Sequence, residues 1–177
     1  DTYYPGSLRG ENLHNIAIEG MKNVRIMQNK LAESQQGIDP SKVHTSNIIE
    51  IALPDNHGNM RRITDLAGKA VLLDFHVFAS EGSTQRIMKL RELYNKYHSR
   101  GLEIFQVSLD PEEHFWKTQT AALPWISVRD ADGVDSKLLM LYNIQKLPTF
   151  FLVDKTNTLY KRDEQIKDLD AEIQKIL

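Results

Sequence analysis

The chain has 177 residues, of which 24 are acidic and 22 basic, giving a formal net charge of -2 at pH 7. With about 150 residues per domain, this length predicts one domain and an appendage, and the 41% hydrophobic and 26% charged residues are typical of a folded globular protein. The near-zero charge argues against nucleic-acid binding, and the absence of cysteine excludes disulfides, thiolate metal sites and thiol catalysis.

Residues 1–44 are predicted to form a helical extension and a linker ahead of a main domain at 45–177. Within residues 11–36, small or apolar residues recur at alternating spacings of four and three: Leu13, Ala17, Gly20, Val24, Met27 and Leu31. This spacing predicts an amphipathic helix. It packs either on the main domain or on an upstream domain or partner helix.

The chain contains no apolar run of about 18 residues, so no transmembrane segment is predicted. The first residues lack the basic and apolar regions of a signal peptide. Because there is no initiating methionine, we expect a processed form or an excised fragment, with any targeting segment upstream.

From about residue 47, short apolar runs alternate with helical periodicity. Strands are predicted at 48–53, 60–63, 70–78, 102–109, 125–128, 150–153 and 158–161. Helices are predicted at 83–99, 110–120, 136–142 and 164–177, with one helical turn at 64–67. Strands that alternate with helices and end in a hairpin predict an α/β sandwich, a mixed central sheet with helices on both faces.

Three residues within this pattern carry further information. Asp74 lies inside the most apolar strand, where an ionised carboxylate is costly unless it is paired or neutralised. Pro148 directly precedes an apolar run, which places it at a strand start where a cis bond can occur. Asp110 precedes Pro111, a pattern typical of a helix N-cap and first helical residue.

Four segments in order resemble the thioredoxin superfamily, in particular the bacterial extracytoplasmic thiol-disulfide oxidoreductases of the TlpA and ResA type: ITDLAGKAVLLDF, LRELYNKYHSRGLEIFQVSLD, LPWISVRDADGV and YNIQKLPTFFLVD. The resemblance covers about residues 45–177. It implies a thioredoxin-like sandwich and an extracytoplasmic location. In that family a Trp-Cys-x-x-Cys motif follows the LLDF strand and begins the next helix, whose N-terminus favours the thiolate of the first cysteine.

The chain departs from the family at this motif. Ungapped alignment from Phe75 fills the five motif positions with Ala79, Ser80, Glu81, Gly82 and Ser83, so serines replace both cysteines. A serine hydroxyl does not ionise at neutral pH and cannot exchange with a disulfide. As written, the chain is therefore predicted to be neither a thiol-disulfide oxidoreductase nor a thiol peroxidase.

Three interpretations of these serines are open. Natural loss of redox function leaves a peptide-binding, protein-binding or structural module. Alternatively, the native protein is an oxidoreductase whose cysteines at 80 and 83 were replaced by engineering. The third is serine-based chemistry, which needs a base held by another group, and no Gly-x-Ser-x-Gly elbow is present.

Other site residues follow from the resemblance. It implies that Asp74 is a buried acid that assists proton transfer at the second cysteine, so without a thiol it is expected to persist as a hydrogen-bonded core acid. His76 is close in sequence to Asp74 and Ser80, which suggests a triad, but we expect a structural histidine. Leu147 and Pro148 are expected to offer backbone to an extended peptide facing residues 80–83, unless this proline is only a constraint of the fold.

No cofactor and no metal site are predicted. The six histidines show no pairing at i and i+4, and no glycine-rich phosphate loop is present. The predicted partner is a peptide or protein at the surface around Ser80 and Pro148, and an architectural role would instead dock residues 11–36 on an upstream domain.

Overall fold

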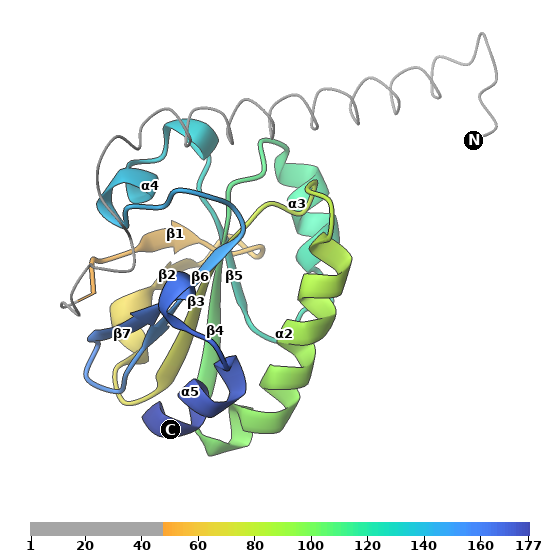
Figure 1. Ribbon diagram of the computed structural model, residues 1–177. Coiled ribbons are helices and arrows are strands. Elements are labelled where there is room, and N and C mark those ends of the chain that lie inside the picture. The colour runs from red at the N-terminus through yellow and green to blue at the C-terminus, as the bar shows by residue number, and fades with distance from the viewer. Residues whose placement is uncertain (1–47) are drawn as a thin grey trace, which may run out of the picture.

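A five-stranded mixed sheet lies at the centre of the computed structural model, which describes residues 48–177 (Figure 1). Its strands, in spatial order, are β5 (Ile126–Arg129), β4 (Leu102–Ser108), β3 (Ala70–His76), β6 (Thr149–Val153) and β7 (Leu159–Arg162). Strands β3, β4 and β5 run parallel, whereas β6 is antiparallel to β3 and β7 to β6. The predicted mixed sheet is therefore confirmed.

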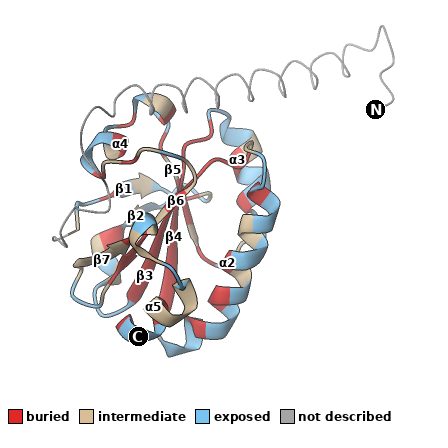
Figure 2. Cartoon of the chain, in the orientation of Figure 1, coloured by how far each residue is buried: buried red, intermediate tan, exposed pale blue. Residues whose placement is uncertain are grey.

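Strand β3 is the central strand because its residues can be buried on both faces. All seven of them are buried, as Figure 2 shows for the middle of the sheet. Successive side chains of a strand point to opposite faces, so Leu72 enters one core cluster while Leu73 enters the other. A nearly continuous apolar run is the pattern expected for such a doubly covered strand.

Helices cover both faces of the sheet. Helices α2 (Ser83–Tyr97) and α5 (Leu169–Ile176) pack on the face of Leu72, and α4 (Lys137–Leu141) packs on the face of Leu73. The latter face also receives Ile51 and Ile63, which flank a small separate sheet of β1 (Ala52–Pro54) and β2 (Met60–Arg62). Short 3-10 turns complete the fold at Ile63–Leu66, His98–Arg100, Gly133–Asp135 and Asp163–Gln165.

The helix predicted from Asp110 starts later than expected. Helix α3 spans Glu113–Thr120 and its N-cap position is Glu112. Asp110 is instead fully buried at the end of β4, where its carboxylate accepts hydrogen bonds from another loop. The prediction was wrong because these partners are more than 30 residues away in sequence.

The helix predicted at 164–177 is interrupted. A 3-10 turn at Asp163–Gln165 is followed by extended backbone at Ile166, and α5 begins only at Leu169. The cause is local, because the side chain of Asp168 accepts a hydrogen bond from the amide of Ala171 and caps a new helix. The apolar face is retained, with Ile173 and Ile176 buried.

The extension predicted over residues 1–44, including the stripe at 11–36, lies outside the described residues. Among residues 48–177, no helix has the length and apolar character required to cross a membrane.

A pair of substitutions tests the assignment of the core. Leu72→Ala, at a side chain with 0% exposure, is expected to lower the free energy of unfolding by about 2–5 kcal/mol, because it removes apolar contacts and leaves a cavity. Met140→Ala, at a side chain with 80% exposure, is expected to change it by less than about 0.5 kcal/mol. Urea denaturation of both variants measures the difference, and equal losses would contradict the assigned core.

Candidate functional site

The loop between β3 and α2 carries the five motif positions. Ser80 is half-buried, Glu81 and Gly82 are exposed, and Ser83 is the first residue of α2. The amide of Ser80 donates to the carbonyl of Val77 at 3.1 Å, and the amide of Ser83 donates to the carbonyl of Ser80 at 3.3 Å. Gly82 adopts a left-handed conformation with φ of 80°, which glycine accepts without steric cost. Two successive tight turns thus present the loop at the start of the helix.

The segment Leu147–Pro148 lies next to this loop. Thr149 pairs with Phe75 in the antiparallel register, so Pro148 comes level with His76 at the end of β3. The peptide bond between Leu147 and Pro148 is cis. Leu147 and Ala79 both pack against the same core cluster. The register therefore places Pro148 at the end of the sheet from which the motif loop departs.

His76 contacts Ser83 rather than Ser80. Its Nε2 lies 2.8 Å from Ser83 Oγ, and its ring packs edge-on against Phe78 with centroids 4.6 Å apart. Its Nδ1 lies 4.0 Å from Asp74 Oδ2 and has no hydrogen-bond partner. His76 is fully buried, as expected of a structural histidine, and the alternative triad with Ser80 does not form because the imidazole contacts Ser83.

Asp74 is a buried acid held by three hydrogen bonds from two side chains. Its Oδ1 accepts from both Nε and Nη2 of Arg86 in α2, and its Oδ2 accepts from Gln106 in β4 at 3.0 Å. Gln106 in turn accepts from the indole of Trp125 at 3.1 Å. The ion pair with Arg86 supplies the compensation that a buried carboxylate requires.

The pKa of His76 is held below its ordinary value. Burial is the largest cause, because it disfavours the charged imidazolium, and Arg86 acts in the same direction. Asp74 and Asp110 oppose this shift through their negative charge. Since the lowering effects dominate, the imidazole of His76 is neutral at pH 7.

Asp110 holds the start of the motif loop, directly after β3. Its carboxylate accepts from the amides of Phe78 at 2.9 Å and Ala79 at 3.2 Å. The hydroxyl of Ser108 also donates to it, at 2.6 Å. The chain therefore leaves β3 along a path set by a side chain from the end of β4.

Sequence reasoning missed three residues of this site. Arg86 lies three positions after Ser83 on the same helix, a spacing that places both on one face. Gln106 is a polar residue inside an apolar strand, the same signal that singled out Asp74. For Asp110 the local sequence pointed to helix capping, and its true role depends on a contact between two distant loops.

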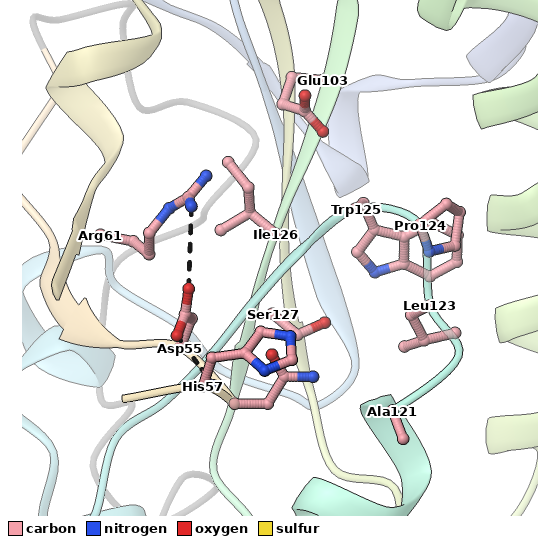
Figure 3. Close-up of a pocket in the computed structure, with 11 residues that line it drawn as sticks. Asp55, His57, Arg61, Glu103, Ala121, Leu123, Pro124, Trp125, Ile126 and Ser127 are labelled. Atoms are coloured by element: carbon pink, nitrogen blue, oxygen red, sulfur yellow. Dashed lines mark hydrogen bonds and ion pairs between the residues drawn. The ribbon is translucent and has the colours of Figure 1, made fainter. Parts of the chain in front are cut away.

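A separate cavity of about 280 Å³ lies beside β5 (Figure 3). Arg61 and Asp55 face each other across 3.7 Å on one wall, and Leu123, Pro124 and Trp125 form the opposite wall. None of its lining residues belongs to the motif loop or to Leu147–Pro148. Within residues 48–177 no group of three or more metal-ligating side chains occurs.

Comparison with known proteins relates the chain to thioredoxin-like proteins. The family described as thioredoxin-like matches residues 68–159. A thiol-disulfide oxidoreductase, ResA, of Bacillus cereus is 31% identical over 130 residues, covering 69% of this chain and 72% of that protein.

Two solved structures share the fold. The solution structure of an uncharacterized thioredoxin-like protein from Bacteroides vulgatus is 51% identical, with a TM-score of 0.70 and coverage of 78% of this chain and 90% of that one. The thioredoxin domain of a thiol-disulfide oxidoreductase from the same organism is 28% identical, with a TM-score of 0.67 and coverage of 76% and 98%.

Removing the Asp110 carboxylate tests its control of the loop. Asp110→Ala leaves the amides of Phe78 and Ala79 without their acceptor, and we expect a loss of about 1–3 kcal/mol in the free energy of unfolding. Faster amide hydrogen exchange at residues 78 and 79 should accompany the loss. Asp132→Ala, at an exposed acid, is the control, and unchanged exchange at 78 and 79 in Asp110→Ala would contradict the role.

Titration of His76 should make stability depend on pH. The folded chain keeps His76 neutral, whereas the unfolded chain binds a proton below about pH 6.5. The free energy of unfolding is therefore unaffected by His76 above that pH. It decreases as the pH falls below it, with a slope of at most about 1.4 kcal/mol per pH unit. Urea denaturation between about pH 7 and about pH 5 measures the slope.

Two variants assign this slope to one residue. His76→Gln removes the titrating group and should flatten the dependence. His57→Gln removes an exposed histidine, and the pH dependence of its free energy of unfolding should match that of the wild type. An identical slope in His76→Gln would show that another group is responsible.

Proposed function

This chain belongs to the thioredoxin-like family, and we propose that it is a redox-inactive member that binds an extended peptide or protein segment. The proposed binding surface consists of residues 79–83 together with Leu147 and Pro148. One observation carries the proposal: Ser83 begins α2 three residues after Ser80, and the cis Pro148 lies level with the end of β3 from which their loop departs, in a chain that has no cysteine.

The chemistry of these residues supports binding without electron transfer. Thiol-disulfide exchange requires a thiolate that attacks a disulfide sulfur, and neither Ser80 nor Ser83 supplies one. The exposed residues Glu81 and Gly82 and the half-buried Leu147 and Pro148 still offer a surface to a ligand. An extended peptide can add to such a segment through main-chain hydrogen bonds.

The second candidate is a thiol-disulfide oxidoreductase whose native residues at positions 80 and 83 are cysteines. The relatives named as oxidoreductases favour it. The retained acid Asp74 favours it as well, since the family places a buried acid beneath the motif. The codons at positions 80 and 83 in the natural gene distinguish the two candidates directly.

The resemblance to the TlpA and ResA type also leads us to propose an extracytoplasmic location. An architectural role, in which residues 11–36 dock on an upstream domain, is the alternative to peptide binding. Deleting residues 1–44 would then change the oligomeric state or solubility, which size-exclusion chromatography measures.

Peptide binding can be tested with alkylated insulin B chain, an unfolded peptide whose blocked cysteines cannot exchange disulfides. Titrated into the isotopically labelled chain, it is expected to shift the amide resonances of residues 79–83 and 147. The amides of Arg61 and Trp125, in the separate cavity, are the internal control and should not move. Shifts confined to that cavity, or none at all, would contradict the proposal.

A redox assay tests the inactivity of the chain as written and the competence of the remaining scaffold for thiol chemistry. The chain as written should reduce insulin no faster than buffer with dithiothreitol alone, because it has no thiol. The double variant Ser80→Cys/Ser83→Cys should gain turnover if the rest of the scaffold is competent. The single variant Ser83→Cys is its control, since one thiol cannot form the intramolecular disulfide. Turnover by the unmodified chain would overturn redox inactivity.

A further inference from the structure

We propose that Ser83 and His76 form a nucleophile and general-base pair that accepts an acyl group from small carboxylic esters onto the Ser83 hydroxyl. This activity goes beyond peptide binding and does not depend on it. The pair is formed across the end of β3 and the start of α2, where Nε2 of His76 and Oγ of Ser83 are 2.8 Å apart.

The surroundings of His76 fix the direction of this hydrogen bond. Its Nδ1 faces Asp74 Oδ2 at 4.0 Å, and Asp74 is ion-paired with Arg86. A lone pair on Nδ1 would be repelled by the carboxylate, whereas an N–H there is attracted to it. The proton of the neutral imidazole therefore lies on Nδ1, so Nε2 accepts from the hydroxyl of Ser83. A nucleophilic serine needs its hydroxyl proton directed at a base in this way.

Ser80 provides a contrast within the same loop. Its hydroxyl donates to the carbonyl of Val77 at 2.6 Å, and a backbone carbonyl cannot serve as a general base. The two serines differ by three positions in sequence but only Ser83 has an imidazole partner. Ser80 is therefore not expected to form an adduct.

The start of α2 also suits the charge that develops in acyl transfer. Ser83 is the first residue of a 15-residue helix. The amides of Ser83 and Arg86 already donate to the carbonyls of Ser80 and Gly82, and the N-terminal end of the helix carries positive potential. This potential stabilises an oxyanion that forms next to Ser83.

Acylation needs only the ester, Ser83 and His76, and water enters as a reactant when the acyl group is released. Ser83 Oγ attacks the ester carbonyl as Nε2 of His76 takes its proton. The bond between the carbonyl carbon and the alkoxy oxygen then breaks, and the alkoxide leaves with the proton from His76 as an alcohol. Acyl-Ser83 remains, and water hydrolyses it to the acid and free serine.

Burial limits both the size of the substrate and the rate. Ser83 is only 9% exposed, so the acyl group that reaches it must be small. The gap of 4.0 Å between His76 and Asp74 is too long for a hydrogen bond, and Arg86 and Gln106 already bind the same carboxylate. The imidazolium formed during attack is thus weakly stabilised, which predicts slow acylation.

The test uses diisopropyl fluorophosphate, a small electrophile that reports activated serines by forming a bond from Oγ to phosphorus with loss of fluoride. The whole chain is treated at pH 7.5, roughly one unit above the ordinary histidine pKa, and the modified residue is located by peptide mass spectrometry. We expect a single adduct on Ser83. Ser83→Ala should abolish labelling, and Ser99→Ala, at an exposed serine outside the motif loop, should leave its rate within about twofold of the wild-type rate.

The role of His76 is tested in two ways. His76→Gln should slow labelling by about 10²- to 10⁴-fold, the usual contribution of a general base. If that variant does not fold, the pH profile of wild-type labelling replaces it, and the rate should fall on acidification as His76 gains a proton. An adduct on another residue, no adduct above that of the urea-unfolded chain, or a rate independent of both His76 and pH would overturn the proposal.

Discussion

The ion pair between Asp74 and Arg86 is the interaction on which the site depends. Asp74 is fully buried in the central strand, and a buried carboxylate that loses its partner costs about 3–5 kcal/mol. Arg86 must therefore stay against β3, and it lies one helical turn after Ser83. The pair fixes the rotation of α2 about its axis, and thereby places the Ser83 hydroxyl over His76.

Two further constraints position the rest of the loop. Asp110, at the end of β4, binds the amides that follow β3, and the antiparallel register of β3 and β6 brings Pro148 level with His76. Neither constraint involves the residues at positions 80 and 83. These constraints position the loop and Pro148 without any sulfur atom. Serines at positions 80 and 83 are therefore compatible with both.

The absence of cysteine leaves two hydroxyls at the motif positions, and these have different hydrogen-bond partners. In the family the first motif position carries the nucleophile, but here the hydroxyl of Ser80 donates a hydrogen bond to the backbone carbonyl of Val77. The second position keeps an interaction with a base, through His76. The hydroxyls at the two motif positions thus have unlike partners. This difference matters because an oxygen nucleophile depends on a neighbouring base far more than a thiol does.

The sequence by itself determined the order of the strands and helices, the buried acid at position 74, and the loss of thiol chemistry, because apolar periodicity and residue type are local properties. It also indicated that residues 79–83 and 147–148 belong to one surface, through the family resemblance. Only the tertiary structure decided that Asp110 holds a loop rather than a helix, and that His76 meets Ser83 rather than Ser80. Both depend on how β3, β4 and α2 pack together, and such contacts leave no periodic signal in the chain.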